Sequence, residues 1–362
     1  MTRPKICVYA ISLNEEQFVQ RFVESCRDAD CIIVADTGSM DKTVEKLEEL
    51  GVIVYKISVK PFRFDTARNI ALGLVPHDID MCISMDMDEI LTPGWRKQLD
   101  TTWMQTKTKP SGISYKYIWS WNSDNTPCIY FNTEKIHARH GYNWRYPCHE
   151  ALSWTLEEAE TRLFCPLEIH HYPDNTKSRT QYLDILKMGI REYPWSARPA
   201  YYYARELFFN NKYNESIIEF ERYLSLSDAN YTHERAAALV FCMQASMNLL
   251  RSYEICLNYL TRSNLEVENG NAYMWMARLS YQCSRWAECS DYCNKAIDNK
   301  EDTAFSSCPE INSSLPYDYL SICSWHLNLY ADAVKWVKIA LEYEPDNLRL
   351  KDNLIVYQVK CN

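Results

Sequence analysis

Two carboxylates one residue apart follow a short apolar run in this chain. Asp86 and Asp88 lie in the segment Met85–Glu89, directly after the run Met81–Ser84. An apolar run of that length predicts a buried strand, so the acids fall at its C-terminal end, where open α/β sheets bind ligands. At this spacing one carboxylate can hold a divalent cation and the other a ligand of that cation. The alternative is structural, because aspartates also form turns and cap helices.

Two further polar segments follow predicted strands. Asn14–Glu16 comes after a strand expected over residues 6–11, and Asp36–Thr43 comes after one expected over residues 31–35. The carboxyl ends of parallel strands meet at one edge of a sheet. We therefore expect both segments to lie on the same edge as Asp86.

The residue types in Asp36–Thr43 suit a nucleotide site. Asp36 can accept a hydrogen bond from the imide N–H of a uracil-type base. Gly38 allows the backbone to turn tightly, and Ser39 or Asp41 can cap the next helix. A plain turn from strand to helix is the alternative.

A fourth segment, Phe62–Asn69, combines a helix start with an arginine. Asp65 is expected at the start of the helix, with Arg68 and Asn69 in its first turn. A helix N-terminus beside an arginine suits a diphosphate. A capping aspartate beside a solvated arginine would give the same pattern.

The elements that must position these residues alternate between strand and helix. The predicted strands are 6–11, 31–35 and 52–55, and the predicted helices are 15–26 and 42–50. This rhythm predicts a largely parallel, doubly wound α/β sheet. Residues 111–121 have no helical partner beside them and are expected to form a later, antiparallel strand.

From about Ala197 the chain becomes helical and repetitive. Four segments combine an aromatic residue, two further residues, and a small residue or cysteine: Tyr213–Ser216, Tyr253–Cys256, Trp286–Cys289 and Tyr330–Ala333. Small residues let paired helices approach, and aromatic residues fill the spaces between them, as in tetratricopeptide repeats. The segment ending at Cys256 is the weakest, and residues 298–316 are expected to form a loop between repeats. We predict an α/β domain over 1–195 and a repeat domain over 196–362.

Taken together, four ordered motifs resemble the inverting family 2 glycosyltransferases with the GT-A fold. The motifs are Leu13–Glu16, Ala35–Thr43, Phe64–Asn69 and Asp86–Glu89. More narrowly, the chain is similar to the branch that carries C-terminal tetratricopeptide repeats and includes peptide S-glycosyltransferases. The Gln-x-x-Arg-Trp motif of processive synthases is absent, which argues against a polysaccharide synthase. The resemblance implies a Rossmann-like GT-A domain, a nucleotide-sugar donor (a UDP-sugar first), and Mn²⁺ or Mg²⁺.

The resemblance also implies a role for each matching residue. The donor-binding residues would be Ile11, Asn14, Glu15, Asp36, Gly38, Ser39, Asp65, Arg68 and Asp86. Asp88 would bind the metal ion. One of His170 and His171 would complete the metal shell, and we favour His171, because His170 should face the opposite side of an extended segment.

The same resemblance places a late His-Glu element near the acceptor. Glu150 is the first candidate for the base that deprotonates an acceptor hydroxyl or thiol, and Glu89 is the second. His149 is a further candidate for a catalytic role. The alternatives are a salt bridge from Glu150 to an arginine and a purely structural histidine at position 149.

Several aromatic residues fall in the region expected near the acceptor: Trp119, Trp121, Tyr142, Trp144 and Tyr146. Aromatic faces stack on sugars or bases, but packing in the core explains such residues equally well. The spacing of His137, His140 and Cys148 fits no standard zinc pattern.

Composition limits the compartment and the partners. The net charge of −9 argues against a large polyanionic partner such as duplex DNA. The first apolar run stops at Asn14–Glu16, so no secretory signal is visible, and no apolar segment is long enough to span a bilayer. The fifteen cysteines are then expected as reduced thiols in a cytoplasmic protein, or in the host cytoplasm if the protein is viral.

The sequence leaves the acceptor open. Helical repeats form concave surfaces that bind peptides or partner proteins, so a protein or peptide acceptor is one hypothesis; the repeats could also dimerise or only support the catalytic domain. A glycan or lipid-linked acceptor is a second hypothesis, and a hydroxymethylated pyrimidine in viral DNA is a third. A scaffold with a degenerate GT-A domain is the alternative from a different class.

Overall fold

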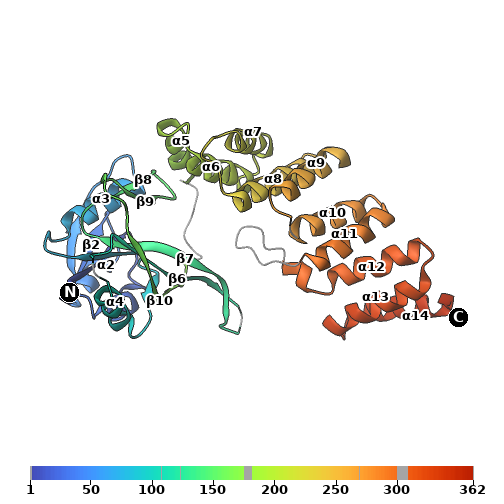
Figure 1. The fold of residues 1–362 in the computed structure, drawn as a ribbon, viewed down its shortest axis with the longest axis horizontal. Coiled ribbons are helices and arrows are strands. Elements are labelled where there is room, and N and C mark those ends of the chain that lie inside the picture. The colour runs from blue at the N-terminus through green and yellow to red at the C-terminus, as the bar shows by residue number, and fades with distance from the viewer. Residues whose placement is uncertain are drawn as a thin grey trace. The chain divides into compact units, whose positions relative to one another are not determined.

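The chain divides into two compact units, Met1–Tyr193 and Pro194–Asn362. The computed structural model describes residues 2–106, 108–122, 124–174, 182–268, 270–299 and 309–361. The first unit combines strands and helices, and the second is helical throughout its described residues (Figure 1).

One large sheet of eight strands dominates the described part of the first unit, in the order β3-β2-β1-β4-β7-β6-β10-β5. The first four strands in this order run parallel, β7 is antiparallel to both β4 and β6, and β10 is parallel to β6. A separate pair is formed by β8 and β9. The strands are β1 (Ile6–Ser12), β2 (Cys31–Asp36), β3 (Ile53–Lys56), β4 (Met81–Met85), β5 (Glu89–Leu91), β6 (Gly112–Trp121), β7 (Pro127–Ala138), β8 (Tyr142–Arg145), β9 (Ala151–Trp154) and β10 (Arg162–His171).

Helices cover both faces of this sheet. Side chains from α1, α2 and α4 join one core with Ile6, Val8 and Ala10 of β1. Side chains from α3 join a second core on the opposite face, with Cys7 and Tyr9. The helices of this unit are α1 (Val19–Cys26), α2 (Thr43–Glu49), α3 (Phe64–Leu74), α4 (Trp95–Met104) and α5 (Tyr182–Glu192). The predicted α/β class and the antiparallel strand over residues 111–121 are confirmed.

The first helix begins later than predicted, at Val19 instead of residue 15. Asn14 takes a left-handed backbone conformation with φ +54°. The backbone N–H of Glu15 donates to the side chain of Thr43, and that of Glu16 to Asp41. The Phe18 N–H donates to the Glu15 carbonyl oxygen three residues earlier, so a tighter turn precedes the α-helix.

A chain of buried polar groups crosses the α3 side of the sheet. The Trp144 indole N–H donates to the Tyr9 hydroxyl at 2.8 Å, and the Tyr9 hydroxyl lies 2.9 Å from Nε2 of His137. His137 Nδ1 lies 2.8 Å from the Ala138 carbonyl oxygen, to which it can only donate. Nε2 is therefore the acceptor for Tyr9, and His137 is neutral. Burial lowers the pKa of His137 to about 4.

This histidine should make stability depend on pH. The pKa of His137 in the folded protein lies below the ordinary value of 6.5. Between the two pKa values, His137 therefore binds a proton in the unfolded chain but not in the folded protein. We expect stability to fall as the pH drops from 6.5 towards 4, by up to about 3 kcal/mol from this residue. Urea unfolding at pH 7.0 and pH 4.5 would measure the loss, and His137→Gln should shrink it. An equal loss in the variant would exclude His137 as its source.

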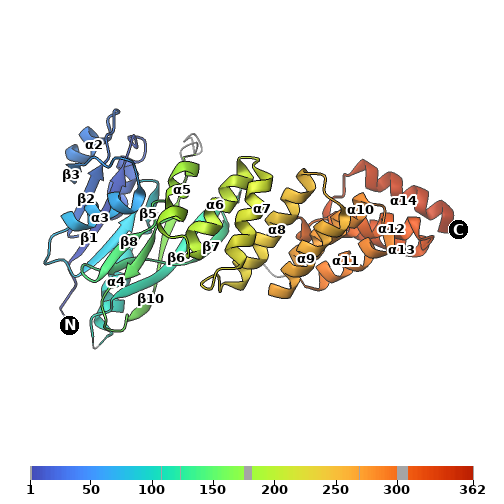
Figure 2. The same ribbon diagram turned by 90° about the horizontal axis from the view of Figure 1, so that it is seen from above.

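The second unit consists of helical hairpins followed by a last helix (Figure 2). Contacts join α6 to α7, α8 to α9, α10 to α11 and α12 to α13, and α14 packs on α13. The helices are α6 (Ala197–Phe209), α7 (Tyr213–Leu224), α8 (Thr232–Asn248), α9 (Tyr253–Glu266), α10 (Gly270–Gln282), α11 (Trp286–Asp298), α12 (Leu315–His326), α13 (Tyr330–Tyr343) and α14 (Leu348–Cys361), with a short 3₁₀ helix η1 (Pro309–Asn312).

The four repeat motifs fall at equivalent places in these hairpins. Each aromatic residue begins the second helix of its hairpin. The small residue three positions later is buried in every case: Ser216, Cys256, Cys289 and Ala333. The predicted helical-repeat class is confirmed, and the hairpin around Cys256 is as regular as the others. Of the expected loop 298–316, residues 300–308 lie outside the described residues.

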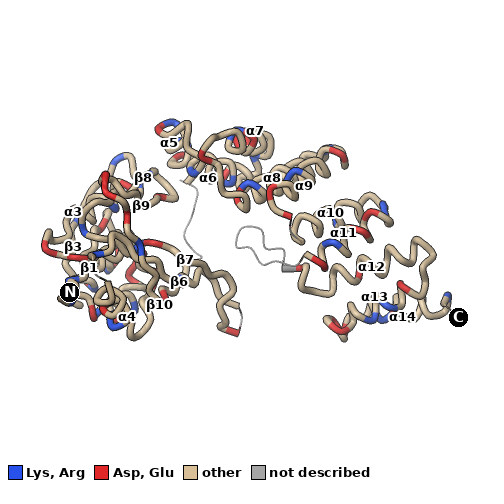
Figure 3. The backbone as a smooth tube through the Cα atoms, in the orientation of Figure 1, with Lys and Arg blue, Asp and Glu red and all other residues tan. Residues whose placement is uncertain are grey.

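Among the described residues, no helix is both long enough and apolar enough to cross a lipid bilayer. Acidic and basic residues are interspersed along both units (Figure 3).

Candidate active site

Three of the predicted segments meet at one edge of the sheet. Ser12 at the end of β1 pairs with Asp36 at the end of β2, and Ala10 of β1 pairs with Met85 at the end of β4. The segments that follow Ser12, Asp36 and Met85 therefore leave the sheet side by side. Ile11 lies on this edge, paired with Ala35.

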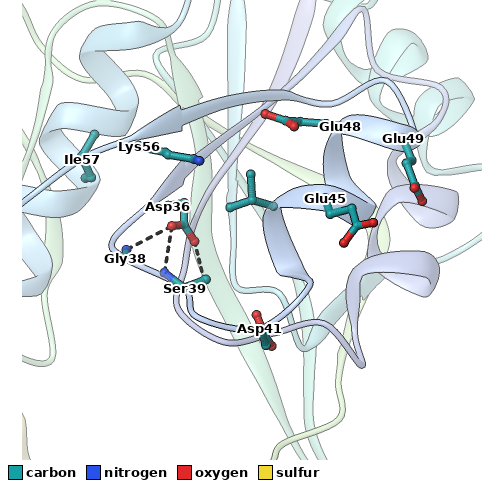
Figure 4. A pocket seen from close by; sticks show the side chains of 10 residues that line it. Asp36, Gly38, Ser39, Asp41, Glu45, Glu48, Glu49, Lys56 and Ile57 are labelled. Carbon is teal, nitrogen blue, oxygen red and sulfur yellow. Dashed lines mark hydrogen bonds between the residues drawn. The ribbon is translucent and has the colours of Figure 1, made fainter.

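Asp36 organises the loop that follows β2. Its carboxylate accepts hydrogen bonds from the Gly38 and Ser39 backbone N–H groups and the Ser39 hydroxyl, at 2.5–3.0 Å (Figure 4). It also accepts one from the Ser12 hydroxyl at 2.9 Å. Gly38 has φ +120°, a backbone conformation that favours glycine. A carboxylate has about four acceptor positions, so these four hydrogen bonds occupy them all. The role predicted for Asp36, contact with the base, would need one of these bonds to open.

The loop after β1 is hydrogen-bonded to the loop after β2. The Asn14 backbone N–H donates to the Ser39 hydroxyl at 2.8 Å, and the Asn14 side-chain oxygen accepts from the Met40 N–H at 2.7 Å. Glu16 accepts from the Lys42 N–H at 3.1 Å. The two predicted donor-binding segments thus form one continuous wall.

A cavity of about 520 Å³ lies on the outer side of this wall, between α2 and the end of β3 (Figure 4). Its lining includes Asp36, Gly38 and Ser39 together with Glu45 and Glu48 of α2. Neither Asp86 nor Asp88 lines it. The cavity therefore borders the predicted donor loop, but it does not contain the carboxylate pair.

Arg68 joins two of the predicted site residues. It is the fifth residue of α3, beyond the first turn in which it was expected, and it is buried. Its guanidinium donates to Asp86 Oδ1 at 2.5 Å and to the Glu150 carboxylate. The expectation of an arginine at the helix N-terminus is wrong, because α3 already begins at Phe64.

Lys135 of β7 completes this cluster, and it was not among the predicted site residues. Its ammonium donates to Asp86 Oδ2 at 3.2 Å and to Glu89 Oε1 at 3.0 Å. Glu89 also accepts from the Tyr117 hydroxyl at 2.7 Å and from the Asp86 N–H at 2.9 Å. A lysine within an otherwise half-buried strand was the only signal that could have revealed it.

The cluster holds three carboxylates and two cations. Burial alone would raise the pKa of Asp86, but Arg68 and Lys135 lower it by more, so this pKa lies well below its ordinary value. Burial opposes the charge of Lys135, but Asp86 and Glu89 outweigh it and raise the pKa of the ammonium. Asp86 therefore stays ionised, and Arg68 and Lys135 balance its negative charge. Asp88 lies outside the cluster.

Asp88 and His171 face each other. Nε2 of His171 lies 3.4 Å from Asp88 Oδ2. Nδ1 of His171 lies 3.1 Å from the Trp119 carbonyl oxygen, to which it can only donate. Metal-binding histidines commonly donate their second ring N–H to a carbonyl in this way, which leaves the other nitrogen free for the ion. His170 lies elsewhere and pairs with Glu168 at 2.9 Å.

Backbone contacts hold these two residues in place. The Tyr172 N–H donates to the Asp88 carbonyl oxygen at 2.9 Å. Arg21 of α1 donates to the Tyr172 carbonyl at 3.0 Å and to the Asp88 carbonyl at 3.4 Å. The end of β10 is thereby fixed against the turn that carries Asp88.

The Asp88 carboxylate and the His171 imidazole are only two protein ligands for a metal ion. Among the described residues, no group of three or more His, Cys, Asp or Glu residues could hold a metal ion. The pair of Asp88 and His171 suits Mg²⁺ or Mn²⁺, which commonly take few protein ligands and complete their shell with substrate phosphates.

Three other residues of the predicted motifs contact neighbouring protein groups. Asp65 is buried and accepts hydrogen bonds from Nε and Nη2 of Arg63, at 2.7 and 2.8 Å. His149 has φ +51° and its ring lies near that of Tyr182. Asn69 exchanges two 2.8 Å hydrogen bonds with the backbone of Trp144, which ties β8 to α3.

The predicted aromatic group divides into buried and exposed members. Tyr142 and Trp144 are buried and pack in the core, whereas Trp119 is 44% exposed. Trp121 stacks on Tyr172 and donates its indole N–H to the His171 carbonyl at 3.1 Å. Of these aromatic residues, Trp119 presents the largest exposed ring.

The site lies in a mostly parallel α/β sheet that joins carboxylates, cations and a histidine at its carboxyl edge. Residues 7–149 match the model of glycosyl transferase family 2. The matched residues make up most of the first unit, and the match supports a glycosyltransferase that uses a nucleotide-sugar donor. No curated protein sequence matches the chain.

Three solved structures show a weak likeness to parts of the chain. Glucosyl-3-phosphoglycerate synthase from Mycobacterium tuberculosis, bound to Mn²⁺, UDP and glucosyl-3-phosphoglycerate, is 24% identical over 32% of this chain and 44% of its own, with a TM-score of 0.27. YrrB, a TPR protein with an unusual peptide-binding site, is 14% identical over 48% of this chain and 82% of its own, with a TM-score of 0.40. MamA is 17% identical over 49% and 99%, with a TM-score of 0.39. These scores assign no ligand to this chain.

Proposed function

We propose that the first unit transfers a sugar from a nucleotide-sugar donor to an acceptor hydroxyl or thiol, with inversion, using Mn²⁺ or Mg²⁺ held by Asp88 and His171. The observation that carries this proposal is the pair itself. Nε2 of His171 faces Asp88 Oδ2 at 3.4 Å while its other nitrogen is fixed by a carbonyl. The pair lies at the carboxyl edge of the sheet, beside the two donor-binding loops.

The chain's own residues would hold the donor beside this pair. Asn14, Glu15 and Asp36 are proposed to contact the base and ribose. Asp86, whose side chain is 37% exposed, would face the ribose and the sugar. When bound, the cation would neutralise charge that develops on the departing diphosphate.

The transfer is a single displacement. The acceptor oxygen or sulfur forms a bond to the anomeric carbon, on the face opposite the leaving group. The bond from that carbon to the diphosphate oxygen breaks, and the nucleoside diphosphate leaves with the electron pair. The acceptor proton passes to a carboxylate.

Glu150 is the proposed base. Its side chain is 12% exposed, whereas that of Glu89 is fully buried. Glu89 also accepts hydrogen bonds from Tyr117, Lys135 and the Asp86 backbone, which leaves it little capacity to take an acceptor proton. The ion pair of Glu150 with Arg68 would have to loosen for the proton to be taken.

Nucleotide binding tests the proposal. Thermal stability would be measured with UDP, GDP, CDP or dTDP, each with and without Mn²⁺. A ligand present at a hundredfold excess over its dissociation constant stabilises by about 2.7 kcal/mol. We expect one nucleotide, UDP first, to give a shift that depends on Mn²⁺. No shift with any of the four would refute the proposal.

The two neighbouring histidines give a matched comparison. His171→Ala should weaken Mn²⁺ binding in the presence of the nucleotide by about tenfold to a hundredfold, as the loss of a metal-site group does. His170→Ala should leave it within about twofold of the wild type, because His170 pairs with Glu168 instead. Calorimetric titration measures both constants. The assignment of His171 would be wrong if the two variants lost affinity equally.

A further inference from the structure

A group of aromatic side chains continues from the proposed metal site onto the β6–β7 hairpin. We call Tyr117, Trp119 and Phe131 the aromatic platform. Tyr117 and Phe131 are cross-strand partners, with ring centroids 5.5 Å apart. The rings of Tyr117 and Trp119 each lie 6.1 Å from the His171 ring and are nearly parallel to it.

Two members of the platform are open to solvent. Trp119 is 44% exposed and Phe131 is 40% exposed, whereas Tyr117 is buried between them and donates to Glu89. Single exposed aromatic residues are ordinary on protein surfaces. These two differ because each contacts a residue of the site: Trp119 lies against His171, and Phe131 lies against Tyr117.

We infer that the aromatic platform binds the acceptor, and that the acceptor presents a sugar ring to it. This inference rests on the proposed function and names its acceptor class. The negative face of an aromatic ring attracts the partially positive C–H groups on one face of a sugar.

The charges beside the platform favour a sugar over a nucleic acid. A base could stack on the same rings, but proteins that bind single strands combine stacking with a positively charged groove. Lys135, 5.7 Å from the Tyr117 ring centroid, is already paired with Asp86 and Glu89. The net charge of the chain is −9. This surface therefore offers little unpaired positive charge to bind phosphates.

Substitution of Trp119 tests the inference. The Trp119 carbonyl that fixes His171 belongs to the backbone, so Trp119→Ala keeps it. Transfer would be measured with a set of sugar conjugates of the nucleotide that the panel identifies as donors, and with methyl glycosides and disaccharides as acceptors. We expect Trp119→Ala to raise the acceptor KM by about tenfold, with a smaller effect on kcat, and Trp119→Phe to restore most of the affinity.

Tyr130 provides the matched control. It is 56% exposed on the same hairpin, and it pairs with Ile118, one position away from the Tyr117–Phe131 pair, so it points to the other face of the sheet. Tyr130→Ala should leave the acceptor KM unchanged. Retention of the Mn²⁺-dependent shift with nucleotide in Trp119→Ala would show that the site is still assembled.

Three results would overturn the inference. The first is an unchanged acceptor KM in Trp119→Ala, and the second is an equal increase in Tyr130→Ala. The third is transfer to a peptide with serine and cysteine, or to an oligonucleotide with 5-hydroxymethylcytosine, but to no glycoside. In all three, nucleotide binding by the wild type would still support the proposed function. Failure of that function would appear separately, as the absence of any nucleotide-dependent shift.

Discussion

Asp88→Asn is expected to lower the rate of donor cleavage by about a thousandfold. The substitution keeps the size of the side chain but removes the charge that would bind the cation, and a catalytic metal ion contributes several kcal/mol, at about 1.4 kcal/mol per tenfold in rate. The Asp86 cluster should persist, because Arg68 and Lys135 pair with Asp86 and not with Asp88. Release of nucleoside diphosphate measures the rate.

A matched substitution separates this effect from a general loss of charge. Asp346 in the helical unit has a fully exposed side chain, so Asp346→Asn should cleave the donor at the wild-type rate. Circular dichroism would check that Asp88→Asn is folded. Donor cleavage within tenfold of the wild type in folded Asp88→Asn would remove Asp88 from the proposed mechanism.

Arg68→Ala is expected to lower the free energy of unfolding of the first unit by about 3–5 kcal/mol, the cost of leaving buried charges unpaired. The Arg68 side chain is 5% exposed and pairs with both Asp86 and Glu150. Its removal leaves three carboxylates with Lys135 alone. Denaturant unfolding measures the loss.

A surface pair gives the corresponding control. Lys5 and Asp78 form a 2.6 Å ion pair in which both side chains are more than half exposed. Lys5→Ala should therefore leave the free energy of unfolding close to that of the wild type. Comparable losses in Arg68→Ala and Lys5→Ala would show that the Arg68 cluster does not stabilise the fold through its charges.

Local patterns were sufficient to predict the order of the elements. Apolar runs and helical periods located β1, β2 and β4, and the aromatic residues of the repeat motifs mark where α7, α9, α11 and α13 begin. Both signals are short-range, because a side chain's face follows from its own spacing along the chain. The start of α1 was missed because a tighter turn precedes it, and the backbone of that turn is hydrogen-bonded to Asp41 and Thr43, more than 20 residues away.

The pairing within the site was harder to predict. Lys135 meets Glu89 across 46 residues of sequence, and no local pattern connects a strand lysine to a distant glutamate. The burial of Trp144 depends on its hydrogen bond to Tyr9, 135 residues away. The family resemblance supplied Asp88 and His171 as candidates, but their 3.4 Å approach depends on how β10 meets the turn after β4.

The configuration of the released sugar tests the central claim most directly. The protein would be incubated with Mn²⁺ and, in turn, α-linked sugar conjugates of the nucleotide identified by the panel, with water as the acceptor. Proton NMR would follow the first minutes of the reaction with the conjugate that is cleaved. Single displacement predicts that the β anomer appears first, together with the nucleoside diphosphate. Appearance of the α anomer first, or no cleavage of a donor whose nucleotide binds, would contradict an inverting glycosyltransferase.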